Sequence, residues 1–389
     1  MRRGIVAVLV FALAGRAWAF DVPTKLLVRD VRYEVRSVDL PSGMRVLIER
    51  EPSRPLVAVV SVVDVGGTLD PPGKEGLAHL VEHLTFRSMQ DKKHPFNDLL
   101  EISGAARWNA STGWDVTTYH SVGAKDSLPA LVALETARLA RPLQRFLDRA
   151  LVPANAVLSI AGDVELAEAE AMVRDYFGGW RPKADQPGFL TAPLPSRGEG
   201  PVPVVKLARP GARQTELRLG CAMPLRGSGD RTAADVLAVR IETRLHRFAR
   251  QMLGATYGFG SRVVPRSGVL ELQVAGTVDA SGAARVLALL RSEAANLGTR
   301  PLDPNDFARA QWDAGLRAST RYEDSRSLAF TLARLRLAGL PANTLEQFPK
   351  DLADLTPAAV QAVAAECRRT AVVGLLGEQA MLDRLVPSG

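Results

Sequence analysis

The sequence predicts an α/β protein of two homologous domains, each a sheet covered by helices, with a shortened first domain. Three observations lead to this prediction. Segments typical of strands and of helices alternate along most of the 389 residues. A stretch rich in proline and glycine interrupts the alternation near the middle of the chain. A segment that precedes this stretch is repeated near the C-terminus.

The N-terminus has the features of a secretory signal peptide. A basic start, Met1-Arg2-Arg3, is followed by the apolar stretch Gly4–Gly15 and by Ala17-Trp18-Ala19, an A-x-A cleavage pattern. We therefore assign residues 1–19 to a signal peptide and expect an exported protein, located in the periplasm of a cell with two membranes. No later segment is apolar enough to span a membrane, so none is expected after cleavage.

Composition narrows the classes of function. The hydrophobic fraction of 47% and the charged fraction of 23% are those of a globular protein with a core. Removal of residues 1–19 takes away three arginines and lowers the formal net charge from +7 to +4. This mild charge, without a block of lysine and arginine, argues against nucleic acid as a partner. Cys221 and Cys367 allow at most one disulfide, and the sequence does not show whether they pair.

The elements of the first half follow in order. Its boundaries are residues 20–180, and a proline-rich linker (181–203) separates it from the second domain (204–389). The expected strands are Tyr33–Leu40, Met44–Glu49, Leu56–Val65, Trp108–Ser111, Val116–Ser121 and Ala156–Ala161. The expected helices begin near Lys74 and Pro95, and cover Leu128–Leu139 and Glu165–Tyr176.

The two halves share one clear segment. Ala156–Asp163 and Ala371–Glu378 align in register, each a buried-type strand that turns on a glycine before an acidic residue. We interpret the halves as divergent copies of one unit. In the second copy 73 residues (298–370) precede the closing strand, whereas 16 residues (140–155) do so in the first. The first half is therefore shorter by 57 residues, expected to be helical, and its sheet is expected to expose apolar surface that a partner or another segment would cover.

One helical run carries a metal-binding pattern. His79 and His83 are four residues apart and project from the same face of a helix. Two imidazoles at this spacing can hold one Zn²⁺, and Glu82 beside them can act as general base. The order H-x-x-E-H is typical of the inverzincin class of metallopeptidases.

Longer motifs around these residues resemble those of the insulinase/pitrilysin (M16) metallopeptidases. The resemblance includes Val65–Phe86, the segment Trp108–Tyr119, the segment Pro153–Asp163 and, in the second half, Arg250–Tyr257. It implies two α/β domains that face each other as a clamshell. It also implies a zinc-dependent endopeptidase in which Glu82 deprotonates a zinc-bound water and Asn109, Arg250 and Tyr257 bind a peptide or unfolded protein substrate.

The third zinc ligand of the resembling family is a glutamate on a helix that falls in the segment the first half lacks. Glu135, on the helix Leu128–Leu139, is the nearest acidic candidate in the sequence, although a solvated helix carboxylate is the simpler interpretation. Two functions stay open: a working zinc peptidase, or an impaired or inactive subunit that acts with a homologous partner. The third alternative is that the sequence is internally deleted relative to its natural gene.

Overall fold

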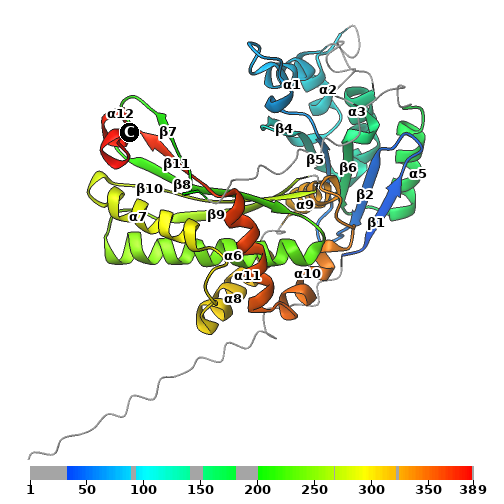
Figure 1. Ribbon diagram of the computed structural model, residues 1–389. Coiled ribbons are helices and arrows are strands. Elements are labelled where there is room, and N and C mark those ends of the chain that lie inside the picture. Colours follow the sequence, from blue (N-terminus) through cyan, green and yellow to red (C-terminus); the bar gives the residue numbers. More distant parts are fainter. Residues whose placement is uncertain are drawn as a thin grey trace, which may run out of the picture.

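The computed structural model describes residues 33–88, 93–140, 152–180, 200–266, 268–320 and 324–387. The predicted signal peptide and residues 181–199 of the predicted linker lie outside these described residues. Figure 1 shows two halves that meet at one side of the molecule and diverge at the other, so that the outline is an open V.

The first half contains a six-stranded mixed sheet. Its strands are β1 (Val35–Asp39), β2 (Arg45–Arg50), β3 (Leu56–Val63), β4 (Ala105–Thr112), β5 (Thr117–Ala124) and β6 (Ala156–Gly162). Their order is β1-β2-β6-β3-β5-β4, and β2 with β6 is the parallel pair. Strand β4 therefore forms one edge of the sheet.

Helices of the first half cover one face of this sheet. They are α1 (Leu77–Arg87), α2 (Phe96–Ile102), α3 (Leu128–Ala140) and α5 (Leu166–Phe177), with short 3-10 turns η2 (Gly67–Leu69), η3 (Lys125–Ser127) and η4 (Pro153–Asn155). Alternate residues of β3, Val57, Val59 and Val63, are buried with Leu131 and Val132 of α3. Successive side chains of a strand point to opposite faces of the sheet, so the other β3 residues face the opposite face of this sheet.

The opposite face of the first sheet is covered by a helix from the second half, α9 (Ser325–Leu337). Ala329 and Ala333 of α9 are buried against the second set of β3 residues, which includes Ala58 and Val60. Two alanines at i and i+4 let the helix approach the sheet closely. The apolar surface that we expected the shortened first half to expose is therefore covered within the chain on this face.

The second half repeats the strand plan. Its strands are β7 (Val204–Ala208), β8 (Thr215–Pro224), β9 (Phe259–Arg266), β10 (Val269–Val278) and β11 (Val372–Gly377). The order β7-β11-β8-β10-β9 matches β2-β6-β3-β5-β4 position by position. Strands β6 and β11 each lie between a parallel and an antiparallel neighbour. The predicted equivalence of these two strands is confirmed by the topology.

Helices of the second half, apart from α9, pack beneath its sheet or, in the case of α12 (Gln379–Leu385), beside its edge strand β7. The others are α6 (Ser228–His246), the π-helical continuation η5 (Arg247–Met252), α7 (Ala280–Asn296), α8 (Pro304–Thr320), α10 (Thr344–Ala353) and α11 (Pro357–Thr370). The segment between α7 and β11, which has no counterpart of equal length in the first half, forms α8 to α11.

A disulfide joins Cys221 of β8 to Cys367 of α11 and so ties the sheet of the second half to its helical layer. Among the described residues, no helix is both long and apolar enough to cross a membrane.

Candidate functional site

Helix α1 carries the H-x-x-E-H motif, and its start is fixed by local interactions. Gly76 adopts a left-handed backbone with φ 92°, which favours glycine, directly before the first helical residue. The carboxylate of Asp70 accepts hydrogen bonds from the backbone N–H groups of Gly76 and Ala78, at 2.6 and 2.8 Å. Asp70 thus satisfies donors at the helix N-terminus that have no partner inside the helix.

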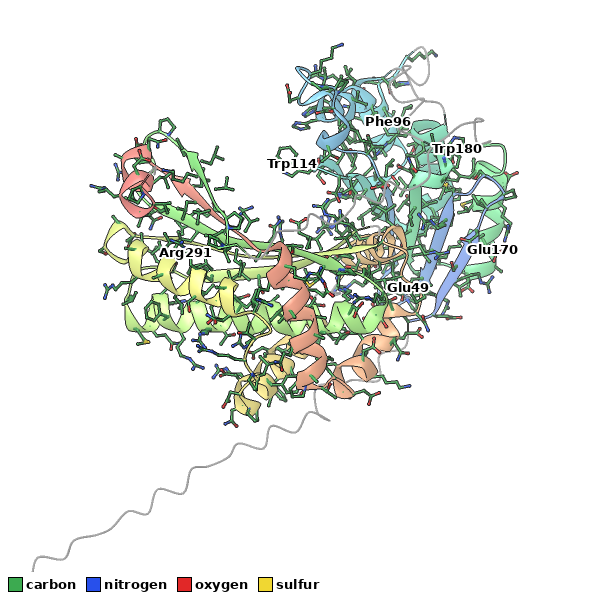
Figure 2. The ribbon with its side chains drawn as sticks, viewed as in Figure 1. Glu49, Phe96, Trp114, Glu170, Trp180 and Arg291 are labelled. Atoms are coloured by element: carbon green, nitrogen blue, oxygen red, sulfur yellow. A yellow bond between two sulfur atoms is a disulfide. The ribbon has the colours of Figure 1, made fainter. Side chains whose placement is uncertain are left out.

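The loop before α1 is held against the turn between β4 and β5. Gly67 and Thr68 donate backbone hydrogen bonds to the carbonyls of Gly113 and Trp114. A Cβ atom on Gly66 would lie 2.5 Å from the Gly113 carbonyl oxygen, so only glycine permits this approach. Trp114 itself is 75% exposed and projects from the first half toward the second (Figure 2).

His79 and His83 lie side by side on the exposed face of α1, with ring centroids 4.7 Å apart. The helical period brings the two imidazoles together, as the four-residue spacing predicted. Glu82, three residues after His79, lies next to them on the side of the helix that packs on the edge hairpin, and it is 5% exposed.

Thr112 holds the Glu82 side chain and is itself next to Thr117. Thr112, the last residue of β4, donates a hydrogen bond from its hydroxyl group to Glu82 Oε2, with an oxygen–oxygen distance of 2.5 Å. Its oxygen lies 3.3 Å from the hydroxyl of Thr117, which in turn donates to the carbonyl of Val65. The edge hairpin and the loop before α1 therefore fix the position of the carboxylate. Sequence reasoning did not single out Thr112, although the Trp108–Tyr119 motif contains it.

The described residues do not complete a zinc centre. Catalytic zinc sites use three protein ligands and keep one position open. His79 and His83 are placed to supply two nitrogens, but within the described ranges no group of three histidine, cysteine, aspartate or glutamate side chains is close enough to hold a metal. Residues 89–92 and 141–151, which flank α1 and α3 in the sequence, lie outside those ranges.

Glu135 is buried and engaged by two neighbouring side chains. It is 4% exposed, accepts a short hydrogen bond from the hydroxyl of Ser61 in β3, and pairs with Arg138 one turn along α3 at 3.5 Å. The Arg138 guanidinium lies 4.4 Å from the ring centroid of Phe96 and 4.5 Å from that of Tyr119. Such contacts stabilise a buried cation. The expectation of a solvated carboxylate at position 135 is wrong, because this face of α3 packs on the sheet.

Asn109 lies on the edge strand β4, and its side chain is exposed. In this structure its Oδ1 accepts a hydrogen bond from the backbone N–H of Ala110 at 2.9 Å. Since β4 has a neighbour on one side only, the backbone groups of its outer edge are free of strand partners within the described sheet.

Arg250 and Tyr257 come together in the second half. Arg250 lies in the π-helical segment η5, a geometry that often marks functional positions. Its guanidinium donates to the backbone carbonyl of Tyr257 at 3.0 Å, and the Tyr257 side chain is 91% exposed. The structure thus places the two residues next to each other, and their contact with a substrate stays a prediction.

A cluster of charges joins the halves where they meet. Arg266, at the end of β9, pairs with Asp115 of the first half and with Glu271 of the second. Burial, together with the neighbouring Asp115 carboxylate, raises the pKa of Asp64 to about 6. Sequence reasoning did not find this contact, because its members are far apart in the chain.

Two family profiles match the chain. The profile described as "Insulinase (Peptidase family M16)" matches residues 45–146, and the profile described as "Peptidase M16 inactive domain" matches residues 141–313. Protease 3 of Escherichia coli K12 is 31% identical over 134 residues, which are 33% of this chain and 14% of that protein. The chain therefore spans a small part of this curated relative.

Solved structures share the fold. A protease from Helicobacter pylori superposes with a TM-score of 0.71 at 15% identity, covering 89% of this chain and 100% of that one. The periplasmic protease PqqL from Escherichia coli gives a TM-score of 0.66 at 16% identity, covering 92% of this chain and 49% of that one. At sequence identities this low, the superpositions establish a shared fold and nothing more. The two profiles, which run from residue 45 to 313, and the motif on α1 show that the chain belongs to peptidase family M16, the insulinase family.

Proposed function

We propose that this chain is an exported peptide-binding member of the M16 family that hydrolyses peptides poorly or not at all by itself and acts with a homologous partner subunit. The observation that carries the proposal is the state of Glu135. The nearest acidic candidate for a third zinc ligand is buried and engaged by Ser61 and Arg138. With two histidine ligands a metal is weakly held and has too many open positions to define one reactive water.

Peptide binding is supported by the edge strand. An extended peptide can add to an exposed sheet edge through main-chain hydrogen bonds, and β4 offers such an edge next to α1. Asn109 lies in the middle of this strand and is exposed. Arg250 and Tyr257 belong to the other half and would bind the same substrate from there.

A labelled extended peptide should bind at least about threefold more weakly to Asn109→Ala than to the neighbouring control Ser111→Ala, as measured by fluorescence anisotropy.

The second candidate is a complete zinc-dependent metalloendopeptidase with Glu82 as general base. The position of Glu82 favours it, because a carboxylate held by Thr112 beside two converging histidines is the arrangement that a general base requires. In this case a residue outside the described ranges, or one supplied by a partner, would complete the site.

Export is supported by the signal pattern in residues 1–19 and by the disulfide between Cys221 and Cys367, since disulfides persist in oxidising compartments. The family neighbour PqqL is described as periplasmic. We propose the same location for this chain when the cell has two membranes.

A fluorogenic peptide assay on the mature chain with added zinc separates the two candidates. Glu82→Gln serves as background, and the zinc content of both proteins is measured by mass spectrometry. We expect turnover indistinguishable from that of Glu82→Gln and less than one zinc per chain. Zinc-dependent turnover at least about tenfold above Glu82→Gln would overturn the first proposal and support the second.

A further inference from the structure

Helices α6, α7, α8 and α11 lie beneath the second sheet, on the side away from the space between the halves (Figure 1). Residues of these helices line a groove. Two adjoining hollows form it, of about 70 and 150 Å³, and both are lined by Arg240 and Arg244. The larger hollow also has Arg247 and Arg309 in its wall, and the smaller has Arg300. Five arginines thus line these two hollows, which share Arg240 and Arg244.

The groove has an excess of positive charge. Glu293 and Asp306 are the carboxylates that line it, so five cations face two anions. Glu293 is 7% exposed and is already used by two arginines, Arg244 at 2.7 Å and Arg240 at 3.4 Å. The remaining charge is therefore not neutralised by the groove itself.

Several of these guanidinium groups retain free hydrogen-bond donors. Within the described residues, the side chains of Arg247 and Arg300 form no ion pair or hydrogen bond, and Arg309 has a single long contact with Asp313 at 3.9 Å. Arg240 Nε is buried and has no partner there. Like charges held together repel one another, so an anion in the groove would lower the free energy of the folded protein.

The donor geometry indicates which anion fits. A guanidinium presents a planar fork of N–H groups that matches two oxygens of a phosphoryl group or a carboxylate. The arginines come from α6 and its continuation η5, from α8 and from the loop before α8, and they line a small volume. Such an arrangement suits a tetrahedral group with oxygens in several directions better than a planar one. We propose that this groove binds a phosphoryl group, carried either by a free inorganic phosphate-type anion or by the headgroup of an anionic phospholipid.

The test uses the mature chain and two variants with equal changes of charge. Arg247→Gln/Arg300→Gln removes two groove arginines. Arg285→Gln/Arg291→Gln removes two exposed arginines of α7 that do not line the groove, and Arg291 is labelled in Figure 2. Binding of inorganic pyrophosphate is measured by titration calorimetry at constant ionic strength, and binding of vesicles of phosphatidylcholine with and without phosphatidic acid is measured by cosedimentation.

We expect saturable binding of pyrophosphate, of phosphatidic acid vesicles, or of both, weakened at least about tenfold in the groove variant and by less than about twofold in the control. The arm that responds identifies the source of the phosphoryl group. Failure of both probes to bind, or equal weakening in the two variants, would overturn the proposal. The outcome is independent of peptide hydrolysis, since the groove is on the opposite side of the second sheet from the space that α1 faces.

Discussion

The side chains around α1 divide into two groups with different surroundings. His79 and His83 are exposed, whereas Glu82, Thr112 and Thr117 are part of the packed structure between α1 and the edge hairpin. A buried carboxylate needs hydrogen-bond donors, because leaving it without one costs the desolvation of a charged group. Thr112 supplies this donor, which makes it a positioning residue for Glu82.

Replacement of Thr112 with valine should destabilise the fold. The change preserves shape but leaves the buried Glu82 carboxylate without the hydroxyl donor, so we expect the free energy of unfolding to fall by about 1–3 kcal/mol. Thr112→Ser keeps the hydroxyl and should restore most of the loss. Urea denaturation followed by circular dichroism measures both variants. An unfolding midpoint for Thr112→Val equal to that of the wild type would contradict the role given to this hydrogen bond.

A second carboxylate makes stability depend on pH. Burial, with the charges of Glu51 and Glu34, raises the pKa of Glu49 to about 8, and its Oε2 is buried without a hydrogen-bond partner among the described residues. The folded state therefore holds a proton that the unfolded chain releases near pH 4.5. The contribution of Glu49 to the free energy of unfolding is therefore most favourable below pH 4.5, and it decreases as the pH rises toward 8.

Glu49→Gln should remove this dependence. Glutamine needs no proton to be neutral, so the variant should gain about 2–5 kcal/mol relative to the wild type at pH 8.5 and less than about 1 kcal/mol at pH 5. Thermal unfolding of both proteins across this range is the measurement. A variant that is less stable than the wild type at pH 8.5 would show that Glu49 is ionised and paired in the folded protein.

At the scale of elements, α9 packs on the first sheet, whereas the helices before and after it in the chain, α8 and α10, pack in the second half. It follows α8 of the second half in the chain but lies on the first sheet, where its buried alanines meet β3 and β6. Small side chains at this contact set the distance between helix and sheet.

Ala333→Leu should disturb this contact. Ala333 is fully buried, so the larger side chain would push α9 from the sheet at a cost of about 1–3 kcal/mol. Phe330, which is 38% exposed on the same helix, provides a control, and Phe330→Leu should change the free energy of unfolding by less than about 0.5 kcal/mol. Equal effects of the two substitutions in urea denaturation would exclude tight packing at this position.

At the scale of the molecule, α9 makes the two halves dependent on each other. Without the second half, the first sheet would expose the alternate apolar residues of β3 and β6 that now lie beneath α9. Apolar sheet surface of this kind drives aggregation.

The first half should therefore fail to fold without the second half. We expect residues 20–180 to aggregate when expressed alone and to become soluble when coexpressed with residues 200–389. Size-exclusion chromatography and unfolding curves of the separate and coexpressed pieces provide the test. A monomeric first half with a cooperative unfolding transition of its own would contradict this expectation, and a soluble second half alone would be compatible with it.

The sequence alone determined what depends on local periodicity. The i, i+4 spacing that brings His79 and His83 together, the alternation of β3, and the matching strands β6 and β11 are properties of short segments, so the chain order was sufficient to predict them. Only the tertiary structure decided which distant residues meet. The burial of Glu135 against Ser61, the disulfide between Cys221 and Cys367 and the crossing of α9 to the first sheet each join residues far apart in the chain. Their proximity is set by how the layers pack, and no local pattern encodes that packing.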